Sequence, residues 1–140
     1  MAEYTNEIVI ARPIDAVRAA LDDPELATRW VSGLQKVEPV DGAFAEVGGH
    51  ARYHFAQHGM EFALDRKVKA LAPGRREIAF ESPMFSTEVE EELEEVDGGT
   101  RVVSRNVISS SGPPIADSMV EDMKARQAAD FERLKELLEG

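Results

Sequence analysis

Three successive hairpins between residues 50 and 110 constrain the fold more than any other feature of this sequence. Each consists of two stretches of alternating apolar and polar residues around a short turn, at His58-Gly59, Ala72-Pro73-Gly74 and Asp97-Gly98. Successive side chains of a strand point to opposite faces, so a register shift of one residue would turn the apolar residues toward water. The pattern therefore predicts an antiparallel sheet with one apolar face.

The three turns set the registers of this sheet. A two-residue turn at His58-Gly59, a three-residue loop at 72–74 and a type I′ turn at Asp97-Gly98 pair apolar residues on one face and opposite charges on the other. The predicted apolar-face pairs are Phe55/Phe62, Tyr53/Leu64, Val68/Ile78 and Leu93/Val102, with Ala51 opposite Arg66. The predicted pairs on the other face are Lys69/Glu77, Glu94/Arg101 and Glu90/Arg105. Cross-strand pairs of these kinds stabilise a sheet.

The stretch TEVEEELEEV, residues 87–96, is compatible with two structures. Val89, Leu93 and Val96 fit the apolar stripe of a helix, and Glu is a good helix former. The Asp97-Gly98 turn favours a strand, because it pairs the glutamates with the arginines of TRVVSRNVI. On this interpretation the glutamates form a solvated sheet face and not a metal site.

The segments outside the hairpins alternate between extended and helical patterns. Loose alternation and β-branched residues predict a strand, and Pro13 suits the first turn of a helix. Asp22 or Asp23 is expected to cap a second short helix. The expected elements are a strand in YTNEIVIA (4–11), helices in PIDAVRAAL (13–21) and DDPELATRW (22–30), and extended sequence in GLQKVEPV (33–40).

The chain is predicted to be helical from the end of SSSGPP (109–114) onward. A helix of roughly 24 residues would be about 36 Å long, enough to cross a small domain. Gln127 interrupts its apolar stripe, which consists of Ile115, Met119, Met123, Phe131, Leu134 and Leu138. An antiparallel sheet that curls around this helix would bury both apolar faces.

Length and charge narrow the classes of function. The 140 residues suit a single domain, 1–140, with room for one internal pocket. A net charge of −11 disfavours binding to nucleic acid and to anionic membranes. The chain has no Cys, which excludes disulfides and thiolate chemistry. We see no signal peptide and no apolar stretch near the roughly 18 residues of a membrane span, so we expect a cytoplasmic protein with no stable membrane insertion.

The order of the predicted elements, together with several motifs, resembles the START-related superfamily called SRPBCC, in particular its polyketide cyclase/dehydrase-like members. The motifs are EIVIARPIDAVRAALDDPELATRW, VEPVDG, VGGHARYHF, GGTRVVSR and FERLKELLEG. The resemblance implies an α+β helix-grip fold, in which a curved antiparallel seven-stranded sheet wraps around a long C-terminal helix. It also implies two short helices between strands 1 and 2.

The resemblance implies two alternative functions. The first is binding of a small hydrophobic ligand, such as a lipid, polyketide or aromatic compound, in a cavity between sheet and C-terminal helix. Some relatives add cyclase/dehydrase-type activity. The second is a protein-interaction or accessory module, similar to chaperone activators, with no ligand chemistry. Either way we expect a monomer or homodimer without a cofactor.

The candidate ligand-binding residues come from the predicted inner face of the sheet, Trp30 and the long helix. Most are packing residues, but Arg66, Glu91, Ser104 and Asn106 are polar and would need partners in a core. A polar patch in an apolar concavity is typical of a small-ligand pocket. The candidates are Trp30, Tyr53, Phe55, Phe62, Leu64, Arg66, Phe80, Val89, Glu91, Ser104, Asn106, Met119, Met123 and Gln127.

Glu91 is the candidate catalytic residue, with four interpretations left open. It forms an internal ion pair with Arg66, or a bulge turns one of the two outward, or it contacts a ligand without reacting, or it is a desolvated carboxylate that moves a proton of an enolisable ligand. The predicted register places Glu91 opposite Ser104 and Val89 opposite Asn106. Arg75-Arg76 is interpreted as a solvated turn.

Trp30 and the histidines complete the candidates. Trp30 is either a structural anchor for the short helices or part of the cavity entrance, and its partly polar ring suits both places. His50, His54 and His58 are spaced by four residues, which covers about 13 Å along a strand. Ligands of one zinc ion lie about 2.0 Å from it, so we expect no metal site there.

Overall fold

The computed structural model describes residues 2–57 and 59–140, which form one seven-stranded sheet, two short helices and one long helix. The elements in chain order are β1 (Ala2–Ile10), α1 (Ile14–Leu21), α2 (Pro24–Trp30), β2 (Leu34–Asp41), β3 (His50–Gln57), β4 (Met60–Ala72), β5 (Arg75–Glu81), β6 (Phe85–Val96), β7 (Gly99–Ser110) and α3 (Asp117–Glu139). TEVEEELEEV is therefore a strand, as the Asp97-Gly98 turn indicates.

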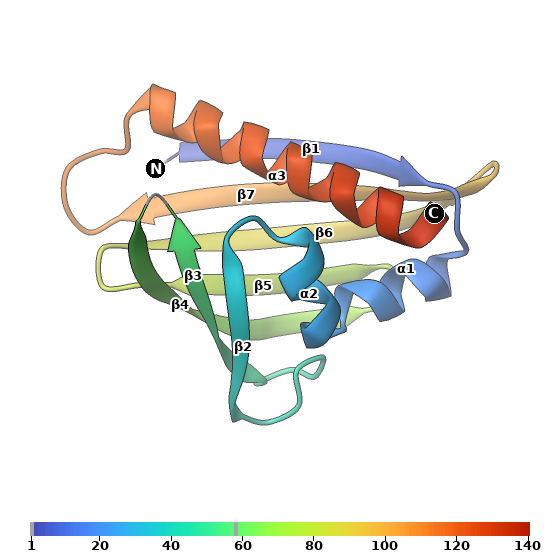
Figure 1. The fold of residues 1–140 in the computed structure, drawn as a ribbon, viewed down its shortest axis with the longest axis horizontal. Helices are drawn as coiled ribbons and strands as arrows, with labels where there is room; N and C mark the ends of the chain where they lie inside the picture. The colour runs from blue at the N-terminus through green and yellow to red at the C-terminus, as the bar shows by residue number, and fades with distance from the viewer. Residues whose placement is uncertain (1, 58) are drawn as a thin grey trace.

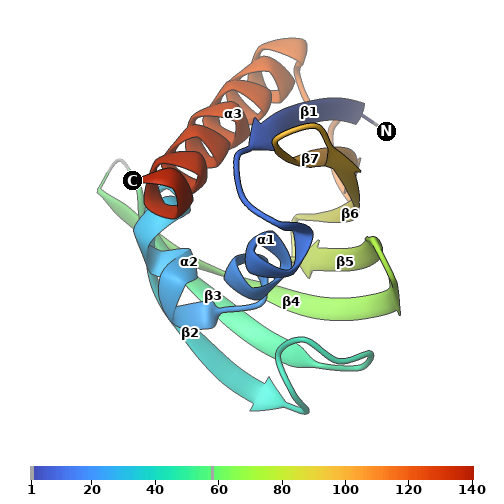
Figure 2. The same ribbon diagram turned by 90° about the vertical axis from the view of Figure 1, so that its right-hand side faces the viewer.

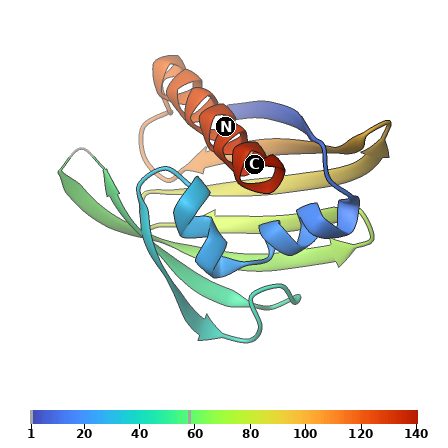
Figure 3. The same cartoon turned by 45° about the vertical axis from the view of Figure 1, so that its right-hand side comes forward.

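The sheet is antiparallel throughout and curves around α3. Its strand order is β1-β7-β6-β5-β4-β3-β2, so β1 and β2 are its two edges. Figure 1 shows α3 crossing the sheet alongside β1, and Figure 2 shows the strands curling beneath it. The two short helices lie between β1 and β2 and cover one end of the concave face (Figure 3). This is the predicted helix-grip architecture.

The registers of the first and third hairpins are as predicted. Phe55 pairs with Phe62, and Leu93 pairs with Val102. The charged pairs of the third hairpin also lie opposite one another, as do Glu91 and Ser104. His58, half of the predicted first turn, lies outside the described residues.

The second hairpin differs from the prediction. Ala72 pairs with Arg75, so the turn consists of Pro73 and Gly74 alone, with Gly74 at φ 74°. A two-residue turn would by itself place Lys69 opposite Ile78. A bulge at Lys69 instead restores the Val68/Ile78 pair and leaves Glu77 opposite Ala70. The predicted Lys69/Glu77 pair is therefore wrong, because the bulge keeps Val68 on the buried face.

The main core lies where α1 and the C-terminal half of α3 meet the ends of β1, β6 and β7. Asp23 caps α2 by accepting hydrogen bonds from the backbone N–H groups of Glu25 and Leu26. The fully packed residues of this core are Ile10, Val17, Ala20, Leu21, Leu93, Val102, Phe131 and Leu134. Ile115, predicted to belong to the apolar stripe, precedes α3. None of the described helices combines the length and apolar character needed to cross a membrane.

Candidate functional site

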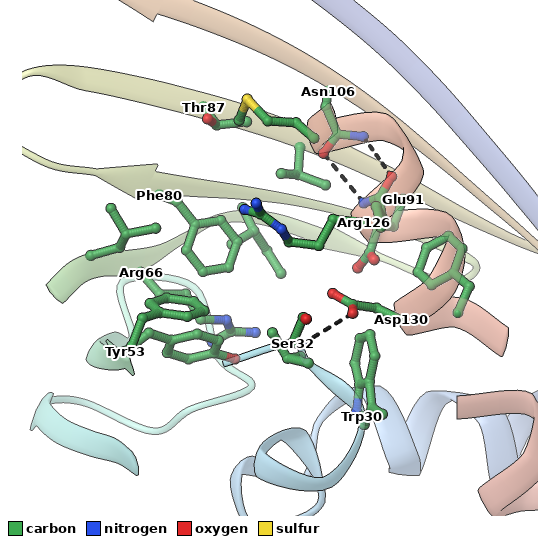
Figure 4. Close-up of a pocket in the computed structure, with 18 of the residues that line it drawn as sticks. Trp30, Ser32, Tyr53, Arg66, Phe80, Thr87, Glu91, Asn106, Arg126 and Asp130 are labelled. Atoms are coloured by element: carbon green, nitrogen blue, oxygen red, sulfur yellow. Dashed lines mark hydrogen bonds between the residues drawn. The ribbon is translucent and has the colours of Figure 1, made fainter. Parts of the chain in front are cut away.

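A cavity of about 270 Å³ lies between the concave face of the sheet and α3. Figure 4 shows side chains from both layers pointing into it. Its walls are mostly apolar, with several charged and amide side chains. The lining residues are Tyr4, Leu21, Trp30, Val31, Ser32, Tyr53, Phe55, Gln57, Phe62, Leu64, Arg66, Arg76, Ile78, Phe80, Phe85, Thr87, Val89, Glu91, Asn106, Met123, Arg126, Gln127, Asp130 and Phe131.

Four aromatic side chains of β3, β4 and β5 form a continuous apolar wall. The rings of Phe55 and Phe62 are stacked with centroids 5.2 Å apart. Tyr53 meets Phe80 edge to face at 5.3 Å and lies 6.2 Å from Phe55. Phe62, 40% exposed, forms the outer end of this wall. Aromatic groups in such arrangements attract one another and offer large apolar faces to a ligand.

Arg66 projects from β4 into the cavity and is 2% exposed. Its Nη1 donates a hydrogen bond of 2.8 Å to the carbonyl oxygen of Phe44, and its Cζ lies 3.8 Å from the centre of the Phe44 ring. Phe44 is held there by a tight loop, in which a Cβ on Gly49 would lie 2.0 Å from the carbonyl oxygen of Ala43. Burial lowers the pKa of Arg66 below its usual value.

Glu91 is paired with Arg76, not with Arg66. The two residues lie directly opposite each other on β6 and β5, with Arg76 Nε 3.0 Å from Glu91 Oε1. This contact is an ion pair without hydrogen-bond alignment, and Arg76 also contacts Asp22 at the end of α1. Arg76 is 6% exposed, so its interpretation as a solvated turn residue is wrong. Arg76 is buried because its position on β5 points toward the concave face, where the carboxylates of Glu91 and Asp22 contact it.

Asp130 brings a second carboxylate into the cavity, from the middle of α3. Its Oδ1 accepts a hydrogen bond of 3.1 Å from the Ser32 backbone N–H and contacts the Arg133 guanidinium. Burial raises the pKa of Asp130 to about 6, although Arg133 and the Ser32 N–H both act to lower it. Figure 4 shows Asp130 and Ser32 facing each other beside Trp30. A carboxyl group with this pKa can hold or release a proton near neutral pH.

The amide of Gln127 connects α3 to the sheet. Its Nε2 donates to Ser104 Oγ at 3.0 Å, and its Oε1 accepts from Asn106 Nδ2 at 3.1 Å and from Asn6 Nδ2 at 2.8 Å. Asn106 and Ser104 are also hydrogen-bonded to each other at 3.3 Å. Asn106 and Gln127 border the cavity, whereas Ser104 lies behind them. The predicted polar patch is therefore partly a structural connection.

Trp30 has both of the roles that the sequence allows. Its ring packs 6.3 Å from that of Phe131 and contacts the main core, and it also lines the cavity. Its Nε1 is buried and has no hydrogen-bond partner among the described residues. Burial raises the pKa of Tyr4, another lining residue, to about 12.

Most of the predicted ligand-binding residues line one cavity. The two exceptions are Ser104 and Met119, which is 55% exposed near the start of α3. Met119 precedes Met123 by about one turn of α3, and at that point the helix no longer covers the cavity that Met123 lines. Whether the lining residues bind a ligand stays a prediction.

The sequence interpretation missed Ser32, Arg76, Arg126 and Asp130. Asp130 has a visible signal, because it follows Met123 by seven residues and Gln127 by three and so shares their helix face. Arg76 alternates with Ile78 and Phe80 on an inward face, a signal that its place beside a turn obscured.

The histidines pair with carboxylates on the outer face of the sheet. His50 Nε2 lies 3.0 Å from Asp65, and His54 Nε2 lies 2.9 Å from Glu38. Side-chain hydrogen bonds to these histidines lower the pKa of each carboxyl group. Within residues 2–57 and 59–140 there is no group of three or more His, Asp or Glu residues that could hold a metal ion. His58 lies outside the described residues.

A family model described as "Polyketide cyclase / dehydrase and lipid transport" matches residues 1–139. Among curated proteins, none matches this chain.

Similar folds occur in several solved structures. Ara h 8.0201 is 17% identical with a TM-score of 0.80, covering 98% of this chain and 97% of its own. An uncharacterised protein from Rhizobium leguminosarum is 22% identical with a TM-score of 0.78, covering 99% of this chain and 94% of its own. DynU16, from the dynemicin biosynthetic locus, is 21% identical with a TM-score of 0.72, covering 98% of this chain and 47% of its own. At these identities the likenesses show the fold alone.

Proposed function

Because the chain belongs to the polyketide cyclase/dehydrase and lipid-transport family, we propose that it binds a small, mainly apolar ligand between the sheet and α3. The cavity of about 270 Å³ carries this proposal. Ligand pockets are typically apolar concavities with a few convergent polar groups, and this one is near the lower end of their usual size. A small aromatic compound or a single aliphatic chain suits it better than a large lipid.

The open space of the cavity and the side chains that line it favour ligand binding over an interaction module. A module without ligand chemistry would have its interior filled by its own side chains. Here the space between the layers is open, and Arg66, Glu91 and Asn106 border it together with the aromatic wall. Glu91 and Asn106 have partners within the protein, whereas Arg66 has no carboxylate partner among the described residues. A buried charged group costs folding free energy unless it is partnered, so the presence of Arg66 beside an open space supports a role in recognition.

The direct test is native mass spectrometry of gently purified protein, followed by extraction and identification of any bound compound. A panel of small aromatic and aliphatic compounds is then tested by the shift in melting temperature. We expect a reproducible apolar passenger or a panel compound that raises the melting temperature. A protein that carries nothing and responds to no compound would contradict the proposal.

A matched pair of variants locates the binding. Val89 lines the cavity, and Val107 lies on the opposite face of the neighbouring strand. Val89→Phe should fill the cavity and weaken binding at least tenfold, whereas Val107→Phe should leave it unchanged. Equal effects of the two variants would show that binding occurs elsewhere.

Proton transfer of the cyclase/dehydrase type is a second candidate function, favoured by the pKa of about 6 of the cavity carboxyl Asp130. A base with this pKa could remove a proton next to a carbonyl group. The test is hydrogen–deuterium exchange of 1-phenyl-1,3-butanedione, followed by NMR. The protein should accelerate exchange with a profile that rises through pH 6, and Asp130→Asn should remove the acceleration. Equal rates for both proteins would eliminate Asp130 as the base.

A further inference from the structure

Arg66 differs from the other buried charged groups around the cavity in having no carboxylate partner. Arg76 contacts both Asp22 and Glu91, and Asp130 contacts Arg133. Arg66 forms no ion pair with any described residue, although it is 2% exposed. A buried charge without a partner of opposite sign is costly, and proteins rarely keep one.

The contacts of Arg66 compensate its charge incompletely. A guanidinium group has five N–H donors, and one hydrogen bond, from Nη1 to the Phe44 carbonyl oxygen, uses one of them. The Phe44 ring adds a cation–π contact on one face of the group. Burial is the main cause that lowers the Arg66 pKa, but an arginine side chain stays protonated at every accessible pH. The cation therefore faces the cavity with donors to spare.

The carboxylates nearest to Arg66 are engaged elsewhere. Glu91 and Asp22 influence Arg66 only as distant charges, because both contact Arg76. Tyr53 also lines the cavity, and Figure 4 shows its side chain next to that of Arg66. The described residues provide no hydrogen bond to the Tyr53 hydroxyl group, so it is a second donor at the same place.

We propose that the ligand of this cavity carries a carboxylate that binds Arg66, with the Tyr53 hydroxyl group as an additional donor. This inference rests on the proposed function and names the substrate class: small aromatic or aliphatic carboxylic acids. The planar guanidinium fork matches a carboxylate, and the aromatic wall beside it accepts the apolar part of the molecule. A ligand with a single carboxylate would balance the one positive charge of Arg66.

The overall charge of the protein makes this a local effect. A net charge of −11 repels acids from the surface as a whole. A preference for an acid over its neutral analogue therefore needs a cation at the binding site. Arg126 is the other candidate for this cation. It is an exposed residue of α3 whose side chain extends toward Phe80 in Figure 4.

The experiment compares matched pairs of compounds by calorimetry at pH 7.5: 2-naphthylacetic acid with its amide, and decanoic acid with decanol. We expect each acid to bind at least tenfold more tightly than its neutral partner. Arg66→Met should reduce this preference to less than twofold while the neutral compounds still bind. The control is Lys67→Gln, which removes a positive charge from the adjacent, outward-facing residue of β4 and should keep the preference.

A measurement on the unaltered protein covers the case in which Arg66→Met does not fold. The carboxyl carbon of ¹³C-labelled 2-naphthylacetic acid reports the pKa of the bound acid. An apolar cavity would raise this pKa above the value of the free acid, and pairing with Arg66 would lower it. We expect a lower value; a raised one would overturn the inference.

The remaining outcomes separate this inference from the proposed function. If the neutral compounds bind as tightly as the acids, the carboxylate inference falls and apolar ligand binding stands. If no member of either pair binds and no passenger is found, both fall. If Arg126→Gln removes the acid preference and Arg66→Met keeps it, the assignment to Arg66 is wrong.

Discussion

Two ion pairs of the same kind lie on opposite faces of β6. Glu91 faces Arg76 on the concave side, and Glu94 faces Arg101 on the convex side, each pair being directly opposed across neighbouring strands. The side chains of the concave pair are 10% and 7% exposed, and those of the convex pair are 66% and 38% exposed. The two ion pairs therefore consist of the same residue types but differ in how far water surrounds their charges.

Three carboxyl groups on the convex face and the cavity carboxyl of Asp130 on α3 differ in the direction of their pKa shifts. On the convex face, a hydrogen bond from Lys67 lowers the pKa of Glu81, and hydrogen bonds to His50 and His54 do the same for Asp65 and Glu38. Asp130, which faces the cavity, has its pKa raised by burial. Hydrogen bonds thus stabilise the charged forms of these three convex-face carboxyl groups, whereas desolvation dominates for Asp130.

The largest expected effect comes from breaking the concave ion pair. Arg76→Met would leave Glu91 buried without a partner, which typically costs about 3–5 kcal/mol of the free energy of unfolding. Urea unfolding at pH 7.5, followed by circular dichroism, measures it. The double variant Arg76→Met/Glu91→Leu should recover much of the loss, because it removes the unpaired charge. A loss no larger than that of Arg101→Ala would contradict the burial of this pair.

These two pairs also show how far the sequence could predict the molecule. The convex pair followed from the period of two and the Asp97-Gly98 turn, both of which are local properties of the chain. The partner of Glu91 depends on the register between β5 and β6, which is set by the turn at residues 82–84 and not by any of the three hairpins predicted from the sequence. Fold and most of the cavity wall were therefore predictable, whereas the ion pairs inside the cavity were not.

Contacts made by α3 were harder to predict for a similar reason. Periodicity indicates which residues of a helix share a face, but not how far the helix stands from the sheet. Met119 and Met123 share a stripe, yet the first is exposed and the second lines the cavity. Gln127 interrupts the apolar stripe in the sequence, and in the structure it provides the hydrogen bonds that join α3 to β7 and β1.

The second prediction uses the pKa of Asp130. An unfolded Asp has a pKa of about 3.9, and the folded protein holds this proton up to a pH of about 6. Between these values the folded state binds more protons, so this group lowers the free energy of unfolding as pH rises, by about 3 kcal/mol at most. The stability of Asp130→Asn relative to the wild type should therefore increase between pH 4 and 6 and level off above pH 7.

Urea unfolding at several pH values measures this difference, and Glu81→Gln on the convex face is the control. The pKa of Glu81 is lowered in the fold, so its contribution is present at neutral pH and is lost as pH falls. The two variants should therefore show opposite pH trends relative to the wild type. A pH-independent difference for Asp130→Asn would mean that Asp130 is not buried as described.

The third prediction concerns the connection between α3 and the concave face. Gln127→Met keeps the size of the side chain but leaves Ser104 and Asn106 without their partner on α3. Buried polar groups that lose a hydrogen bond typically cost about 1–3 kcal/mol. Thermal unfolding gives the loss, and Asn106→Leu in the same background should add little, since both changes remove the same contact. Fully additive losses would show that the network is not coupled.

The smallest expected effect comes from the convex pair. Arg101→Ala removes a contact of 3.3 Å with Glu94, in which both side chains remain substantially exposed. Such pairs contribute less than about 1 kcal/mol, because water and mobile ions already solvate both charges. Urea unfolding in low salt and in 1 M salt checks this, since screening should remove what difference there is. The loss for Arg76→Met should change less with salt, because ions cannot enter the space between sheet and helix as freely. If salt weakened both losses equally, the contrast between the two faces would have to be attributed to something other than burial.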